Sequence, residues 1–194
     1  MSLRNLVPAL GLVCFAAACN SLPHTPGENV TTQKGSTLEE KSPIEVAIAP
    51  LKDSSGNAAL PRAELRSSFQ AALVKRRYTP IALELVDRKV VNAAYRPGAN
   101  EEQAVLQIEV QRWDTRLWDS RNVIEVTLRA RMIDPENPSG ELWSGVLEKR
   151  FDFGQMEDKF TTDGALRRYA CDTIAAELME AMPARQATPG KGGS

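Results

Sequence analysis

The sequence predicts an α/β domain with a mixed β-sheet, built from a strand–helix–strand unit, an antiparallel meander and a C-terminal helix. Three patterns indicate this fold class: an apolar run over residues 44–51, apolar residues at helical spacing between 61 and 77, and alternating apolar and polar residues over 106–111 and 124–131. Helices that cover one or both faces of such a sheet give a compact two-layer or three-layer domain.

The strand–helix–strand unit begins with IEVAIAPL, residues 44–51, which is rich in β-branched residues and typical of a central strand covered on both faces. A helix is expected to start near Pro61. Its apolar face carries Leu65, Phe69 and Leu73. IALELV, residues 81–86, predicts a second strand. Such a unit normally crosses over right-handed into a parallel pair of strands.

Residues 87–95 predict a short helix, and three β segments follow it. The first two alternate over 106–111 and 124–131, so each presents one buried and one wet face. The third, residues 141–153, comes after the turn sequence DPENPSG. The pattern predicts an antiparallel meander.

The last predicted element is a helix with Asp163 as its N-cap. Its apolar face carries Leu166, Ala170, Ile174, Leu178 and Ala181. Cys171 lies next to that face, where a single cysteine is usually a small core residue rather than a reactive thiol.

The N-terminal residues predict export. Arg4 precedes an apolar run over 6–18 that is short for a membrane span but fits a secretory signal peptide. Ala16–Ala17–Ala18–Cys19 also resembles the bacterial lipobox, although Ala16 stands where leucine is usual. The resemblance implies that Cys19 is acylated after cleavage at residue 18, and Asn20 resembles an outer-membrane sorting signal. The alternative is a core helix with incidental cysteines.

The composition after Cys19 predicts a tether. Residues 19–43 are polar and rich in Pro, Gly, Ser and Thr, so we expect a flexible, lipid-anchored tether before a domain over 44–182 and a disordered tail over 183–194. His24, the single histidine of the chain, lies in this tether and not in the domain.

Charge and cysteine content argue against several functions. The net charge of −1 gives no overall attraction to nucleic acid, and the short basic run Lys75–Arg76–Arg77 fits a helix C-terminus. Cys14, Cys19 and Cys171 lack metal-site spacing. Acidic pairs are present at Glu101–Glu102 and at Asp114 with Asp119, but no phosphate-binding loop or nucleophile elbow accompanies them. We therefore expect no enzyme, no cofactor and no metal.

Two stretches carry a family resemblance. VAIAPLKDSSGN, starting at Val46, and ARMIDPENPSGELWSG, residues 130–145, resemble parts of the TolB N-terminal-like fold. Bacterial envelope lipoproteins with this fold include curli-secretion lipoproteins, activators of peptidoglycan synthases and a neisserial-type lipoprotein family. The resemblance covers about residues 44–180 and implies an envelope protein that binds other components.

The leading functional hypothesis is therefore a lipid-anchored scaffold or accessory subunit on the periplasmic side of the outer membrane. Its expected partner is an envelope protein, either a different protein or a second copy of this chain. The candidate interface is the loop QRWDTRLWDSRN, residues 111–122, with Arg112, Trp113, Arg116 and Trp118, because tryptophan and arginine are favoured at interface hot spots. Alternatively, both tryptophans close the hydrophobic core. The alternative function is an auxiliary lipoprotein of an ABC-type lipid transport system that binds lipid or transporter partners.

Overall fold

The computed structural model describes residues 29–33, 36–92 and 94–186. The predicted signal peptide, the lipidation site Cys19 and His24 lie outside the described residues, so these interpretations stay predictions. None of the helices in the described part of the chain combines the length and apolarity that a membrane crossing requires.

The elements follow one another in a mixed order. They are β1 (Val30–Thr32), α1 (Leu38–Lys41), β2 (Glu45–Ile48), β3 (Lys52–Asp53), α2 (Arg62–Lys75), β4 (Thr79–Pro80), α3 (Leu83–Asp87), β5 (Val90–Val91), β6 (Ala94–Tyr95), β7 (Ala104–Asp114), α4 (Trp118–Arg121), β8 (Val123–Asp134), β9 (Asn137–Asp152), the 3-10 helix η1 (Gly154–Lys159) and α5 (Asp163–Glu180).

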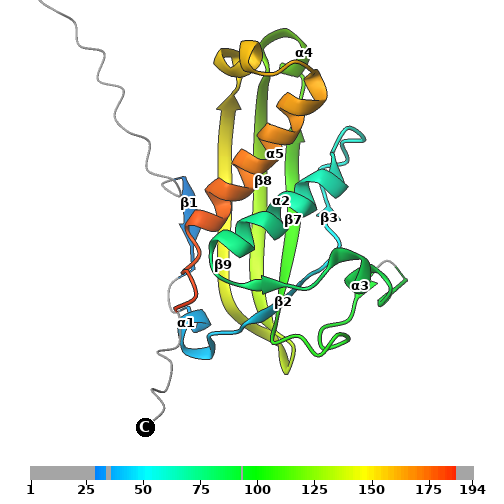
Figure 1. The fold of residues 1–194 in the computed structure, drawn as a ribbon, viewed down its shortest axis with the longest axis vertical. Coiled ribbons are helices and arrows are strands. Elements are labelled where there is room, and N and C mark those ends of the chain that lie inside the picture. Colours follow the sequence, from blue (N-terminus) through cyan, green and yellow to red (C-terminus); the bar gives the residue numbers. More distant parts are fainter. Residues whose placement is uncertain (1–28, 34–35, 93, 187–194) are drawn as a thin grey trace, which may run out of the picture.

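The main sheet has the strand order β1-β9-β8-β7-β2-β4, with β3 paired to β7 beyond the end of β2 (Figure 1). β2 runs parallel to both β4 and β7, whereas β7, β8, β9 and β1 pair antiparallel. The β2–α2–β4 unit, the meander and the C-terminal helix are thus present. The predicted α/β fold class with a mixed sheet is confirmed.

Helices α2 and α5 lie side by side across one face of the sheet (Figure 1). They bury the inward residues of the strands, including Leu106, Ile108 and Leu128, under Phe69 of α2 and Ile174 of α5. Side chains two residues apart on a strand share a face, so the alternation seen in the sequence becomes this core. Cys171 is buried within it, and burial raises the pKa of its thiol to about 12.

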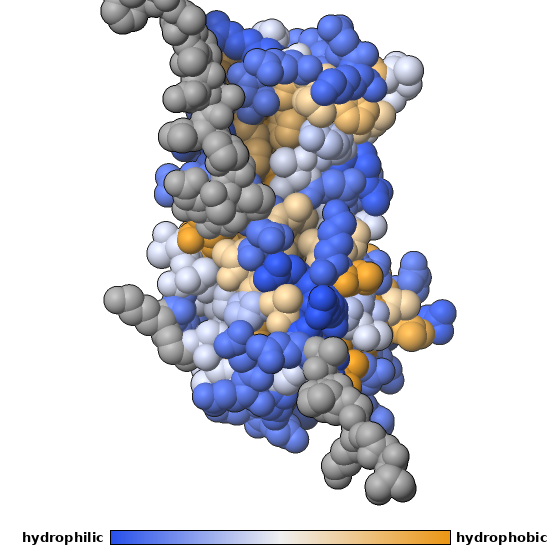
Figure 2. Space-filling model, turned by 60° about the vertical axis from the view of Figure 1, so that its left-hand side comes forward, coloured by the Kyte–Doolittle hydropathy of each residue, from blue (hydrophilic) through white to orange (hydrophobic). Residues whose placement is uncertain are grey.

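Among the described residues, the opposite face of the sheet is covered only at one end. There α3 and the β5–β6 hairpin form a smaller cluster around Val86 and Tyr95, packed on Ala47, Val105 and Ile133 of the strands. Most of this face is polar. The surface on the β1 side of the molecule is also mainly hydrophilic, with an apolar area in the upper part of the view (Figure 2).

The predicted strand over 81–86 and the predicted helix over 87–95 are both wrong. The strand is limited to Thr79–Pro80, after which Leu83–Asp87 forms α3, and Val90–Val91 pairs antiparallel with Ala94–Tyr95. Ladder bonding to β2 ends where the Ile81 N–H donates to the Val46 carbonyl. The chain then leaves the sheet edge, and a helical turn is what lets Val86 bury completely.

Part of the predicted tether belongs to the folded domain. Val30–Thr32 pairs with Gly145–Leu147 of β9, and Leu38 is fully buried. Strand pairing uses backbone groups and needs little apolar content, so composition did not predict it. The first residues of the predicted tail also pack, because the Tyr78 hydroxyl donates to the Pro183 carbonyl at 2.9 Å.

Two boundaries also differ in detail. The run 44–51 forms a strand over Glu45–Ile48 and resumes at Lys52–Asp53. The N-cap of α5 is Thr162, whose hydroxyl accepts a bond from the Ala165 N–H at 3.2 Å, and Asp163 is the first helical residue. Both residue types suit an N-cap, and the extended backbone of Thr162 decides between them.

Candidate functional site

The candidate site lies at the end of the β7–β8 hairpin where α4 connects the two strands. A β-bulge in β7 determines which side chains are exposed there. The register of β7 against β8 shifts between Val110 and Arg112. The extra residue turns Trp113 into the core and leaves Arg112 and Asp114 on the open face. The segment predicted as a loop over 111–122 is therefore largely the end of β7 followed by the short helix α4.

Both predicted tryptophans are buried. Trp113 is 5% and Trp118 is 3% exposed. The indole N–H of Trp118 donates to Asp163 at 3.0 Å, and the guanidinium of Arg167 lies 5.1 Å from the Trp118 ring centre. These contacts favour the alternative in which the tryptophans close the core. They fix the position of the segment between the two tryptophans, and the neighbouring Arg112 and Arg116 stay exposed.

Asp114 is the centre of an exposed charged cluster. The Arg116 guanidinium donates two hydrogen bonds to this carboxylate, from Nε to Oδ1 at 3.0 Å and from Nη2 to Oδ2 at 2.7 Å. The Arg116 backbone N–H adds a bond at 3.1 Å, and Arg112 lies 3.4 Å away. Hydrogen bonding to Arg116 holds the pKa of Asp114 well below its usual range. The carboxylate is therefore ionised and suited to recognition by charge, not to proton transfer.

Arg112 extends the cluster across the open face. Its guanidinium pairs with Glu125 of β8, which also lies 3.8 Å from Arg150 of β9. The candidate interface residues Arg112 and Arg116 are thus brought together around Asp114, while Trp113 and Trp118 support them from inside the core.

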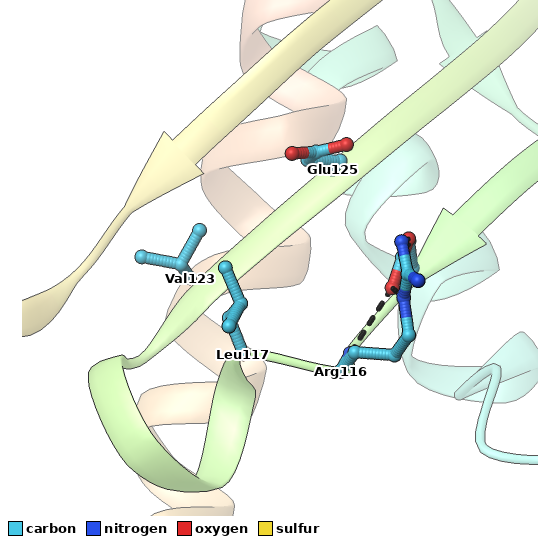
Figure 3. A pocket seen from close by; sticks show the side chains of 5 residues that line it. Arg116, Leu117, Val123 and Glu125 are labelled. Carbon is cyan, nitrogen blue, oxygen red and sulfur yellow. Dashed lines mark hydrogen bonds and ion pairs between the residues drawn. The ribbon is translucent and has the colours of Figure 1, made fainter.

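Two hollows flank this cluster. One, of about 300 Å³, has an aliphatic base of Leu117 and Val123 and a rim of Asp114, Arg116 and Glu125 (Figure 3). Leu117 comes from the turn before α4 and Val123 from the start of β8, and both side chains point into the same space. An apolar side chain of a ligand could be buried against Leu117 and Val123, and polar groups beside it could pair with the charged residues of the rim.

The second hollow, of about 440 Å³, lies on the other side of the cluster between the 55–57 loop and the end of β7. The Asn57 side-chain amide closes it by donating to the Trp113 carbonyl at 2.6 Å. Asp53 orders this loop by accepting bonds from the Ser55 N–H and hydroxyl, at 2.8 and 2.6 Å. The cluster is therefore framed by two structured loops.

Sequence reasoning missed several residues of this site. Leu117 lies between Arg116 and Trp118 and could have been recognised as a large aliphatic residue in a polar segment. Asn57 and Val123 come from other elements and carry no local signal. In the described part of the chain, no group of three or more His, Cys, Asp or Glu side chains is arranged to hold a metal ion.

The sequence has no match among protein-family models or curated proteins. Among solved structures, the PelC dodecamer from Paraburkholderia phytofirmans superposes with a TM-score of 0.51 at 14% identity, over 82% of this chain and 99% of that chain. This similarity shows a shared fold. The TolB N-terminal-like assignment stays a prediction.

Two further structures are similar at lower TM-scores. Lipoprotein GNA1162 from Neisseria meningitidis matches at 23% identity over 68% of this chain and 96% of its own, with a TM-score of 0.47. A DUF4136 family protein from Bacteroides thetaiotaomicron matches at 12% identity over 78% and 91%, with a TM-score of 0.38.

Proposed function

We propose that this protein is a lipid-anchored scaffold or accessory subunit of a bacterial cell-envelope complex, and that it acts by binding a protein partner rather than by catalysis. The observation that carries the proposal is the Asp114 cluster: two exposed arginines converge on one carboxylate between two hollows, above a buried tryptophan pair. Interface hot spots combine such an apolar pocket with surrounding directional polar groups.

The location in the envelope is proposed from the N-terminal sequence. Acyl chains on Cys19 would hold the domain at the periplasmic side of the outer membrane, since two or three chains anchor a protein without a spanning helix. PelC, which shares the fold, is a dodecamer. A second copy of this chain is therefore among the partners to be tested.

Photo-crosslinking in intact cells tests the interface. A photoreactive amino acid placed at position 116 or 117 is expected to capture one envelope protein, while the same probe at Val74, exposed on α2, captures none. Leu117→Asp puts a carboxylate into the apolar base of the hollow and is expected to reduce the adduct from position 116 about tenfold or more. Adducts of equal yield from positions 74 and 116 would count against the proposal.

Metabolic labelling with palmitate tests the anchor separately. The wild-type protein is expected to take up label and to sediment with membranes, and Cys19→Ala is expected to lose both properties. Unchanged labelling of the variant would show that Cys19 is not the acylated residue.

A further inference from the structure

A cavity separate from the two hollows at the Asp114 cluster lies on the open face of the sheet, beside the β5–β6 hairpin. It has a volume of about 210 Å³, and its walls combine basic side chains from the strands with apolar groups from the hairpin and the β2–β3 connection. Its lining includes Ala49, Pro50, Lys52, Tyr95, Arg129 and Arg131.

Strand register brings the basic residues together in two adjacent rows. Lys52 of β3 lies opposite Glu109 of β7, which lies opposite Arg129 of β8. In the next row Gln107 lies opposite Arg131. Residues directly opposite or diagonal on one face of a sheet are within reach of each other, so the three basic side chains surround one space.

Basic groups exceed acidic groups around this cavity. Glu141 accepts from both Arg129 and Arg131, at 3.1 and 3.3 Å. Glu109 is held by Lys52 at 2.8 Å and by the Ser54 hydroxyl at 2.7 Å. Three basic side chains thus meet two carboxylates, which leaves one positive charge among these five groups. A further carboxylate, Glu102, lies next to Tyr95 and accepts bonds from the Gly98 and Asn100 N–H groups.

Both arginines keep donors for a ligand. A guanidinium has five N–H donors in a planar fork. Within the described residues, Arg129 donates to Glu141, and Arg131 donates to Glu141 and Gln107. Their side chains are about two-fifths exposed, at 40% and 41%. The remaining N–H groups can therefore reach an oxyanion in the cavity.

We propose that this cavity binds a phosphate group, with Arg129 and Arg131 as its principal ligands. Arginine binds phosphate through paired charge-assisted hydrogen bonds from its planar fork. A water occupies about 30 Å³, so the volume suits a phosphate group with a few waters and leaves the rest of the ligand outside. Charged residues alone are ordinary on a solvated antiparallel face; the cavity and the uncompensated charge distinguish this position.

The rim of the cavity gives the ligand an apolar neighbour. Val91 is 68% exposed and pairs with Ala94, a residue that lines the cavity. Leu85 of the adjacent α3 is also exposed. The phosphate could belong to a phospholipid headgroup, whose chains would lie over these residues, or to a free phosphate ester.

The test uses the full chain carrying Cys19→Ala, so that the proposed acyl anchor is absent. Binding is measured by equilibrium dialysis against inorganic phosphate at constant ionic strength, and by sedimentation with phosphatidylcholine vesicles with or without phosphatidylglycerol. Arg129→Gln and Arg131→Gln are each expected to weaken phosphate binding about tenfold, the value of a charge-assisted hydrogen bond. Arg131→Lys, which keeps the charge but loses the fork, is expected to lie between wild type and Arg131→Gln.

Arg150→Gln is the matched control, since Arg150 lies on the same face of β9 but pairs with Glu125 outside the cavity. Urea unfolding of each variant checks that the fold is retained. If Arg129→Gln and Arg131→Gln lose only the binding of inorganic phosphate, the ligand is a free phosphate ester. If these variants lose binding to phosphatidylglycerol vesicles, the ligand is a lipid headgroup. Either result supports the site. Absence of binding to both probes, or an equal loss in Arg150→Gln, would overturn it, whatever the fate of the protein-binding proposal.

Discussion

The helix-covered face and the open face of the sheet are built from the same strands, β7, β8 and β9, yet they differ in burial and in charge. On the covered face Leu106, Leu128 and Leu147 are completely buried beneath α2 and α5. On the open face Arg112, Arg129 and Arg131 are partly exposed and paired with carboxylates. Burial of apolar area stabilises the fold strongly, whereas exposed ion pairs contribute little. The covered face therefore supplies most of the stability, and the open face carries the residues of the two proposed sites.

The largest effect is expected on the covered face. Phe69→Ala removes a fully buried ring from α2 and should lower the free energy of unfolding by about 3–5 kcal/mol. Urea unfolding followed by circular dichroism measures the change. Val74→Ala on the exposed side of the same helix should change stability by less than about 0.5 kcal/mol. Similar values for the two variants would contradict the assignment of the core face.

The next effect tests whether the segment before β2 belongs to the covered region. Leu38→Ala is expected to cost about 2–3 kcal/mol, because Leu38 of α1 is completely buried against the main core. Glu40→Ala, an exposed change in the same short helix, should have little effect. If Leu38→Ala leaves the urea midpoint unchanged, residues 30–41 act as a tether after all.

A smaller effect is expected at Gly145, which lies under the Trp143 ring at the β1 edge. A Cβ at this position would lie 2.9 Å from the Trp143 ring and 3.1 Å from Val30, so Gly145→Ala should cost about 1–3 kcal/mol. Gly164→Ala in α5, where nothing lies within 4 Å of the new Cβ, should be neutral or stabilising. A neutral Gly145→Ala would mean that β1 moves away readily.

The smallest effect belongs to the open face and depends on pH. The folded-state pKa of Asp114 is lowered, first by its side-chain bond from Arg116. The contribution of Asp114 to the free energy of unfolding is therefore fully present above the unfolded-state pKa of about 3.9, and it is lost as pH falls through the lower folded-state pKa. Asp114→Asn should lower stability slightly at pH 7, and this difference from wild type should shrink in acid.

Arg116→Gln is the matched variant for this pH dependence, because it removes the partner and keeps Asp114. Parallel urea titrations at neutral and acidic pH are expected to give the same narrowing of the difference for both variants. A difference from wild type that is constant with pH would show that the Asp114–Arg116 pair does not contribute to stability.

Periodicity predicted the elements that pack over long stretches. The α2 and α5 helices and the strands β7 and β8 repeat their apolar residues with a clear period, and the structure places them as expected. The prediction for residues 81–95 was wrong because the elements there are two to five residues long, which is too short to show a period. Its conformation follows from where β4 ends and from the burial of Val86 and Tyr95.

The candidate site was predicted only in part. The mixture of tryptophan and arginine in residues 112–118 predicted the segment that carries the candidate site, but which of these side chains face solvent depends on the bulge near Gln111. Arg129, Arg131 and Lys52 could not be grouped from the sequence, because cross-strand register brings them together from two different segments.

The sequence by itself determined the α/β class, the covered face of the sheet and the prediction that Cys19 carries a lipid anchor, since each depends on local composition or on a repeating period. Only the tertiary structure decided that residues 30–32 and 38 belong to the domain, that both tryptophans are internal, and that arginines from the strands surround a cavity. These features depend on strand register and on backbone pairing between residues far apart in the chain, which no local pattern encodes.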